Sequence, residues 1–168
     1  MKKNIPYNEN LNEVLNQIKK GAFLTVKSGD ILNTMTIGWA SFGIIWNKPI
    51  LMVMVRKSRY THNIIEKADN FTVSVPINVD LKKALIYCGS YSGRDVDKFK
   101  EANLTEKKSQ AVISPIIKEC DYHYECRILF SQPMNAGPFD ATLNNRFYPT
   151  GDLHTIYFGE IVESYIMD

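Results

Sequence analysis

Six or more strand-length segments run along this chain, and no regular alternation of strand and helix separates them. Each is rich in apolar or β-branched residues and is bounded by polar residues, glycine or proline, as is typical of strands. Strands joined by turns and only short helices favour a mainly antiparallel sheet, and we predict that this sheet closes as a small barrel. The segments are residues 22–27, 31–41, 50–55, 71–75, 122–130 and 154–166.

Short helices are expected between some of these segments. Apolar residues at positions 11, 14, 15 and 18 follow helical spacing, and Gly21 stands where a left-handed helix cap is expected. Ser58 is a candidate N-cap for a second helix, because its hydroxyl can satisfy amides freed in the first turn. Two more helices are predicted over residues 80–87 and 95–100. Residues 132–152, with three prolines and two glycines, are predicted to form a long loop.

The composition is that of an ordinary globular protein, with one domain over residues 1–168. Hydrophobic residues make up 45% and charged residues 23%, which is the balance of a folded soluble domain. The formal net charge is +2, too small for a strongly basic nucleic-acid binder, so we expect no nucleic-acid partner. The sequence shows no apolar stretch of signal-peptide or membrane-span length, and we therefore expect a cytoplasmic protein without a membrane partner.

The three cysteines, Cys88, Cys120 and Cys126, form no even set of disulfides and no CxxC motif. Free cysteines usually behave as small buried apolar side chains. We therefore predict reduced thiols that serve packing.

A cluster of cations and hydroxyls follows the segment that ends at residue 55. Its members are Arg56, Lys57, Ser58, Arg59 and Thr61. Arginine offers a planar fork to phosphate oxygens, lysine offers a mobile charge, and the hydroxyls can complete the oxygen shell. Charge-assisted hydrogen bonds contribute roughly 1.5 to 3 kcal/mol each, so three or four can anchor a phosphate. The alternative is a solvated basic strand end, because surface charge runs are common.

Trp39 is a candidate for the wall of a ring-binding site. It follows Gly38 where the chain is expected to leave the sheet, near residues 40–43, and small residues there let a planar ligand approach the backbone. The alternative is a core or interface tryptophan, since large aromatic side chains dominate both environments. No Rossmann or P-loop glycine pattern is present, so a nucleotide would have to be held another way. Together with the basic cluster, Trp39 suits a phosphate joined to a flat aromatic ring.

A third informative segment, residues 88–99, reads CGSYSGRDVDKF. Combined with residues 33–39 and the cluster at 56–61, it resembles the flavin reductase-like, FMN-binding split-barrel family, and within it the flavoredoxin branch. The string SGRDxDKF is fairly specific. The resemblance runs from about residue 21 to residue 163, including the last strand segment, and so covers most of the chain.

The resemblance implies a fold, a cofactor and an activity. The fold is a homodimeric split β-barrel with FMN near the subunit interface. The activity is that of an NAD(P)H-dependent flavin oxidoreductase, in which electrons pass from NADH, NADPH or another donor, such as a redox protein, through FMN to an acceptor. Because the chemistry belongs to the cofactor, no catalytic side chain is expected. Two alternatives stay open: a non-enzymatic FMN-binding electron-transfer protein, and a pyridoxamine-phosphate-oxidase-like barrel with another cofactor.

The resemblance also implies which residues contact FMN. Trp39 would lie beside the isoalloxazine, Ser41 would address the polar edge of the ring, and Phe158 would be a second aromatic side chain near it. The strand positions that it implies for the flavin contacts are Asn33, Met35, Thr36, Trp39, Ala40 and Ser41.

At the other end of the cofactor, Arg56, Ser58 and Thr61 look like the family's contacts to the phosphate and the ribityl chain. Lys98, in the DKF string, is similar to a lysine that reaches the flavin.

Two histidines are further candidates for the cofactor site. His123 and His154 both stand where relatives can carry a histidine near the cofactor, and a structural role is the alternative for each. His62 is expected on a helix surface. The three histidines lie far apart without an HExxH or Cys/His pattern, so no metal site is predicted.

Overall fold

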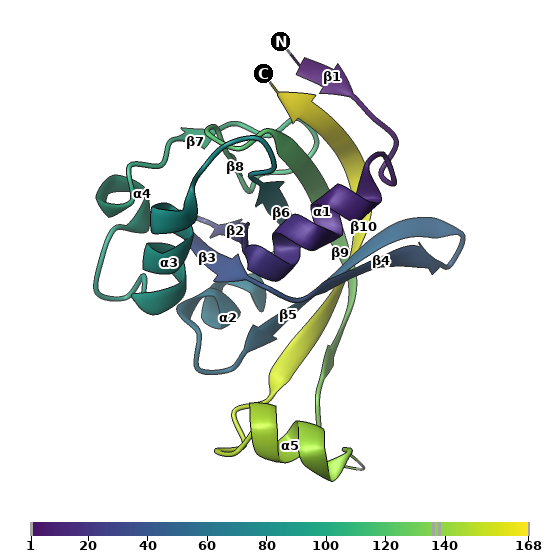
Figure 1. The fold of residues 1–168 in the computed structure, drawn as a ribbon, viewed down its shortest axis with the longest axis vertical. Helices are drawn as coiled ribbons and strands as arrows, with labels where there is room; N and C mark the ends of the chain where they lie inside the picture. Colours follow the sequence, from purple (N-terminus) through teal and green to yellow (C-terminus); the bar gives the residue numbers. More distant parts are fainter. Residues whose placement is uncertain (1, 136, 138, 168) are drawn as a thin grey trace.

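One antiparallel sheet of eight strands organises the fold, in the residues that this computed structural model describes, 2–135, 137 and 139–167. Its order is β3-β2-β6-β9-β10-β5-β4, with β1 paired to β10, and β7 and β8 form a separate pair (Figure 1). The mainly antiparallel fold is therefore confirmed. The strands are β1 Lys2–Asn4, β2 Ala22–Ser28, β3 Ile31–Ile37, β4 Ala40–Ile45, β5 Lys48–Arg56, β6 Asn70–Val75, β7 Glu106–Lys107, β8 Ile116–Ile117, β9 Tyr122–Pro133 and β10 His154–Met167.

The sheet is not closed, so the prediction of a closed barrel is wrong on this point. β3 and β4 follow each other in the chain, yet they lie at opposite ends of the strand order. The chain leaves the sheet at Gly38 and Trp39, and a hairpin then joins β4 to β5. Trp46 and Asn47 have φ angles of 53° and 55°, as a two-residue type I′ turn requires. Hence the segment 31–41 forms two strands and not one.

Short helices connect the strands. Gly21 ends the first helix with a φ of 138°, an angle that favours glycine. The second helix begins after Arg59, so the prediction that Ser58 is its N-cap is wrong. The fourth begins later than predicted, because the carboxylate of Asp97 accepts two amides of its first turn. None of the helices in the described part of the chain is long and apolar enough to cross a membrane. The helices are α1 Leu11–Lys20, α2 Tyr60–Ile65, α3 Lys82–Ser90, α4 Lys98–Glu101 and α5 Ala141–Phe147.

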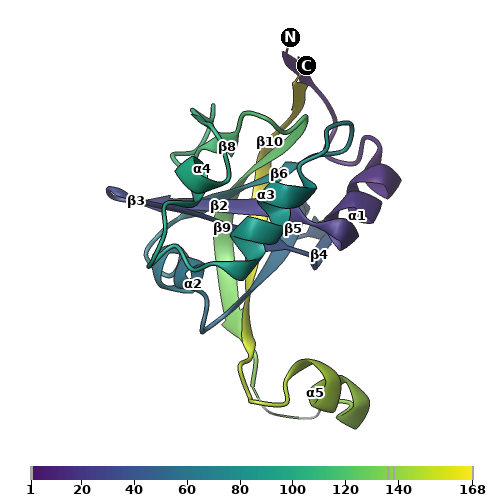
Figure 2. The same cartoon turned by 60° about the vertical axis from the view of Figure 1, so that its left-hand side comes forward.

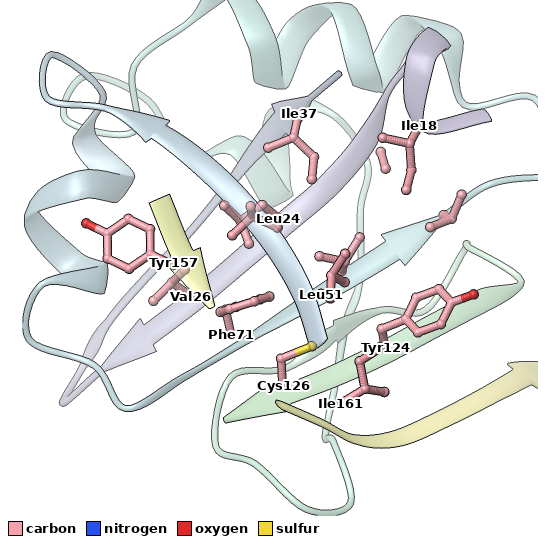
Figure 3. Close-up of a cluster of buried hydrophobic side chains, with 14 of the residues drawn as sticks. Ile18, Leu24, Val26, Ile37, Leu51, Phe71, Tyr124, Cys126, Tyr157 and Ile161 are labelled. Carbon is pink, nitrogen blue, oxygen red and sulfur yellow. The ribbon is translucent and has the colours of Figure 1, made fainter. Parts of the chain in front are cut away.

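The main core is enclosed by the sheet together with α1 and α2. Leu24, Leu51, Phe71 and Tyr157 come from four different strands and are at most 1% exposed (Figure 3). Burial of each such side chain contributes about 1.5 to 3 kcal/mol. Gly159 permits this packing, because a Cβ there would lie 2.5 Å from the ring of Phe71. The three cysteines are also buried and free, which confirms the prediction of packing thiols.

β9 and β10 extend past the body of the protein as an arm, with α5 at its tip (Figures 1 and 2). Residues 132–152, predicted to be a loop, therefore contain a helix. Asp140 caps this helix, since its carboxylate accepts hydrogen bonds from the amides of Thr142 and Leu143. All residues of α5 are exposed except the half-buried Phe147, which meets the body of the protein at Trp39.

Candidate functional site

A hollow of about 160 Å³ lies where β3 ends beside β5 and β10. Five of its nine lining residues carry an apolar or aromatic side chain, and two arginines border it. We refer to it as the apolar hollow. Its lining residues are Met35, Thr36, Ile37, Gly38, Trp39, Met54, Arg56, Arg59 and His154.

A second hollow, of about 260 Å³, adjoins the first, and we refer to it as the cationic hollow. The two share Met35, Arg56 and Arg59 in their walls and therefore lie side by side. Together they reach the range of about 300 to 1,000 Å³ in which small molecules and cofactors bind. The residues of the cationic hollow are Asn33, Met35, Arg56, Ser58, Arg59, Tyr60, Thr61, Ser90, Tyr91, Ser92, Gly93, Arg94, Lys98 and Asp152.

The cationic hollow is built from segments that lie far apart in the sequence. Asn33 on β3 donates a 2.8 Å hydrogen bond from its side-chain amide to Thr61 Oγ1 in α2, and both residues are buried. Gly93, in the loop between α3 and α4, packs directly against Asn33 and leaves no room for a Cβ. The SGRD string thus contributes a glycine whose backbone can lie close to β3.

Positive charge dominates the cationic hollow. It is lined by the cations Arg56, Arg59, Arg94 and Lys98, and among the described residues of its wall Asp152 alone is negative. Guanidinium and ammonium groups in such excess favour an anionic ligand, and arginine forks match the oxygens of a phosphate.

Lys98 is an ammonium group buried at the edge of this hollow. Its Nζ donates a 2.8 Å hydrogen bond to the carbonyl of Cys88, and the residue is 5% exposed. Burial, with a smaller contribution from the charge of nearby Arg59, lowers the pKa of Lys98 to about 8. The charged form is poorly solvated here, so an anion in the hollow would stabilise it.

Trp39 forms an accessible wall of the apolar hollow and is 42% exposed. The ring of Phe147 meets it edge-on at 5.1 Å, and the His154 ring lies 5.4 Å from it. His154 Nδ1 is 2.9 Å from the hydroxyl of Tyr148. Burial, and next the charge of Arg56, lowers the pKa of His154 to about 4. The imidazole is therefore neutral at neutral pH, and the apolar hollow suits an uncharged flat ring.

Asp152 reaches the cationic hollow from the segment that follows α5. Its carboxylate accepts hydrogen bonds from the backbone amide of Ser58 at 3.2 Å and from its hydroxyl at 2.6 Å. Arg56 donates to the carbonyls of Asp152 at 2.6 Å and Phe147 at 3.0 Å. Two of the predicted phosphate contacts are thus bonded to the arm. Ser58 lies one residue too early to cap α2, because Arg59 precedes the first turn.

The structure brings nine of the thirteen residues predicted to contact FMN to the walls of the two hollows. They come from β3, β5, α2, α4, β10 and the turns beside them. These nine residues are Asn33, Met35, Thr36, Trp39, Arg56, Ser58, Thr61, Lys98 and His154.

His123 lies in the core, away from both hollows, and is 1% exposed. Its ring nitrogens lie 2.9 Å from the carbonyl of Cys120 and 3.1 Å from the hydroxyl of Ser74. Burial lowers the pKa of His123 to about 4. This arrangement matches the alternative of a structural histidine.

Ala40, Ser41 and Phe158 also lie outside the two hollows. Ala40 and Ser41 belong to β4 and pair with β5, although we predicted that the chain leaves the sheet there. The ring of Phe158 lies 6.1 Å from that of Trp46 and 5.6 Å from that of Phe130. Phe158, Trp46 and Phe130 thus form an aromatic cluster that is separate from the two hollows.

Three charged residues of the cationic hollow are absent from the predicted set. Arg59 belongs to the basic cluster and Arg94 to the SGRD string, so the sequence carries a signal for both. No sequence signal marks Asp152, because its place in the cationic hollow depends on how the chain returns from α5 to β10.

Comparison with known proteins finds two relatives of this chain in archaea. A protein of Archaeoglobus fulgidus described as uncharacterised is 31% identical over 140 residues, which cover 83% of this chain and 68% of that protein. A second such relative, from Pyrococcus abyssi, is 29% identical over 101 residues, which cover 60% of this chain and 56% of the relative. The chain thus spans between about half and two thirds of these relatives' length.

Solved structures share the fold. The flavoredoxin of Methanosarcina acetivorans aligns with a TM-score of 0.66 and 28% identity, covering 88% of this chain and 68% of that one. An FMN-binding domain of a flavin reductase-like enzyme from Shewanella baltica aligns with a TM-score of 0.70 at 16% identity, covering 99% and 77%. The model of the flavin reductase like domain matches residues 20–168. The chain therefore belongs to the flavin reductase-like domain family, as the motifs in its sequence predict.

Proposed function

We propose that this chain binds FMN and acts as an NAD(P)H-dependent flavin oxidoreductase, which moves electrons from NADH, NADPH or another donor through FMN to an acceptor. The observation that carries the proposal is that the apolar hollow lies beside the cationic hollow and shares three wall residues with it, because FMN is a flat ring joined to a phosphate. Membership of the flavin reductase-like domain family and the likeness to a flavoredoxin support it.

Each side chain has a binding or orienting role in this proposal. Trp39 and Met54 flank the ring, while Arg59, Arg94 and Lys98 attract the phosphate. FMN, when bound, supplies the two-electron chemistry, so no side chain is required as a nucleophile or general acid. The fixed positive charges near the site also favour negative charge that develops on the ligand during reduction.

We also propose that the chain forms a homodimer. Trp46 and Phe130 are 56% and 46% exposed, and their aromatic rings lie 6.4 Å apart. Exposed apolar groups that gather on one surface are typical of contact sites, and a second copy would cover them. Light scattering tests this: a dimer is expected, and Trp46→Glu should yield monomers. A wild-type chain that is monomeric at micromolar concentration would contradict the proposal.

A cytoplasmic location is part of the proposal. Disulfides are rare in the reducing cytoplasm, and the three cysteines of this chain are buried and free. Fractionation of cells that express the chain with a reporter tests this, and recovery in a membrane or secreted fraction would contradict it.

The absorption spectrum of the purified protein, alone and with added FMN, is the first test of cofactor identity. We expect a flavin spectrum or saturable binding of FMN. A colourless protein that ignores FMN would refute the flavin assignment. The spectrum of a different bound cofactor would instead favour a pyridoxamine-phosphate-oxidase-like barrel.

Anaerobic stopped-flow mixing tests the electron donor. We expect NADH or NADPH to bleach the absorption of the bound flavin. If neither nucleotide does so while reduced ferredoxin does, the chain is an electron-transfer protein without a functional nicotinamide site. Both outcomes are read on the same FMN-loaded protein, so they separate the two flavin alternatives.

A further inference from the structure

We propose that Asp152 is an internal latch on the flavin site, which holds the phosphate end closed in the flavin-free protein and has to leave when FMN binds. Asp152 would then set how well the chain discriminates between FMN and riboflavin, which has no phosphate. This inference rests on the proposed flavin function. It assigns a specificity role to a residue outside the set that the sequence predicts.

Asp152 occupies hydrogen-bond donors that suit a phosphate. Its two carboxylate oxygens accept from the backbone amide and the hydroxyl of Ser58, at 3.2 Å and 2.6 Å. A backbone N–H beside a hydroxyl is a ligand set that also binds phosphate oxygens. Asp152 is also the one negative side chain among the described residues of this wall, so its charge stands where a phosphate charge would stand.

Arg56 is hydrogen-bonded to the segment of the chain that carries Asp152, residues 147–153. Its two terminal nitrogens donate to the carbonyls of Asp152 at 2.6 Å and Phe147 at 3.0 Å. The amide of Lys57 also donates to the carbonyl of Leu153 at 3.3 Å. With the segment in this position, two of the five N–H donors of Arg56 are occupied by backbone carbonyls, so fewer are available to a phosphate.

The latch segment, residues 147–153, also reaches the apolar hollow. Phe147 lies edge-on against Trp39 at 5.1 Å, and the hydroxyl of Tyr148 lies 2.9 Å from His154 Nδ1. Phe147 and Tyr148 thus hold the segment against the body beside the ring end, while Asp152 holds it at the phosphate end.

The position of the segment lowers the free-energy cost of moving it away from the body. It begins at the end of α5, whose other residues are all exposed and which lies at the tip of the arm, away from the body (Figures 1 and 2). Segments with few buried apolar contacts open more readily than the core. The contacts of Phe147, Tyr148 and Asp152 with the body are therefore the ones that decide whether the latch is closed.

A carboxylate and a phosphate cannot share the amide and hydroxyl donors of Ser58, and two negative groups at one site repel each other. FMN should therefore bind only the open form, whereas riboflavin tolerates a closed phosphate end. The apparent dissociation constant is the intrinsic constant divided by the open fraction. A latch closed in about nine molecules of ten raises it about tenfold.

Asp152→Asn tests the latch because it removes the charge with little change of shape. The measurement is a fluorescence titration of the full chain, freed of flavin, with FMN and with riboflavin. We expect Asp152→Asn to bind FMN about tenfold more tightly than the wild type, with riboflavin affinity within about twofold. Asp140→Asn is the matched control, since it makes the same change on the arm, at the N-cap of α5, outside both hollows. Both flavin affinities should stay unchanged in it.

Amide hydrogen exchange gives a second readout. FMN should raise exchange in residues 147–153 of the wild type, and riboflavin should not. Asp152→Asn should show raised exchange there without ligand. The latch is refuted if Asp152→Asn binds FMN no more tightly, or if both flavins respond alike, because the carboxylate would then be purely structural. A wild type that binds neither flavin would refute the proposed function instead. In that case hydrogen exchange is measured with inorganic phosphate as the ligand. Unchanged exchange in residues 147–153 on addition of phosphate would then refute the latch.

Discussion

Gly93 and Asn33 lie in such close contact that position 93 has no room for a side chain. A Cβ there would overlap Asn33 Oδ1 and lie 2.8 Å from Asn33 Cγ and 3.0 Å from the ring of Tyr60. Asn33 in turn holds Thr61 through its 2.8 Å hydrogen bond. The loop after α3, strand β3 and helix α2 therefore fix one another at the cationic hollow.

Gly93→Ala should lower the free energy of unfolding by about 1 to 3 kcal/mol, because the added methyl group overpacks this contact. It should also weaken FMN and riboflavin alike, since Asn33 has to move. Urea denaturation and flavin titration measure the two effects. Gly43→Ala is the control, as no atom lies within 4 Å of a Cβ at position 43. Unchanged stability in Gly93→Ala would mean that the loop is not held against β3.

Arg94→Ala should weaken FMN binding by about tenfold or more and leave riboflavin binding unchanged. Arg94 lines the cationic hollow, and a hydrogen bond to a charged group contributes about 1.5 to 3 kcal/mol. Lys57→Ala makes the same charge change in the exposed part of the basic cluster, outside the hollow, and should have little effect. Equal losses in the two variants would show that only net charge matters.

Trp39→Ala should weaken FMN and riboflavin by the same factor, because both carry the same ring. Stacking of a ring on an aromatic side chain contributes about 1 to 3 kcal/mol, which is about fivefold to more than a hundredfold in affinity. Parallel titrations with the two flavins measure it. A loss confined to FMN would remove Trp39 from the ring end of the site.

Most strands can be predicted because their signal is local. The segment 71–75, with alternating apolar residues and a closing proline, forms β6, which begins one residue earlier than predicted. The corner at Gly38 and Trp39 cannot be predicted in this way, because it depends on the pairing of β4 with β5. The closure of the sheet fails for the same reason: it depends on how distant strands meet.

The residues of the binding site also differ in whether a local sequence signal marks them. Arg56, Thr61 and Lys98 lie within motifs, so their place in the cationic hollow can be inferred from the sequence. Ser58 follows a local rule for N-caps, but α2 begins one residue later than that rule requires, and the Ser58 hydroxyl instead donates to Asp152, 94 residues later. No sequence pattern marks Asp152, because its position depends on the arm as a whole.

Acid should destabilise the folded chain through His123. Burial lowers its pKa from 6.5 to about 4, so between these values the unfolded state binds the proton and the folded state does not. The stabilisation is present above pH 6.5 and is lost as the pH falls towards 4. The expected loss is about 2 to 3 kcal/mol between pH 7 and pH 4.

Urea denaturation at several pH values measures this loss. His123→Gln should show a smaller loss between pH 7 and pH 4 than the wild type, even if it is less stable at pH 7. His62→Gln is the control, because His62 is only partly buried and should leave most of the pH dependence intact. An unchanged pH dependence in His123→Gln would contradict the assignment.

Lys98 should make FMN binding depend on pH above neutrality. Burial lowers the pKa of Lys98 to about 8 in the flavin-free chain, so the ammonium is charged at pH 7 and loses its proton as the pH rises through 8. Because a phosphate favours the charged form, FMN affinity should fall between pH 7 and pH 9.5, while riboflavin affinity stays nearly constant.

Lys98→Met should bind FMN more weakly at pH 7 and should lose this pH dependence, since no proton is released at position 98. Lys100→Met removes the same charge from an exposed position of the same helix and should retain the wild-type profile. Titrations of the wild type and both variants with FMN and riboflavin at pH 7, 8 and 9.5 separate these outcomes. If Lys98→Met keeps the wild-type profile, Lys98 does not contact the phosphate, and its buried ammonium only ties α4 to the carbonyl of Cys88.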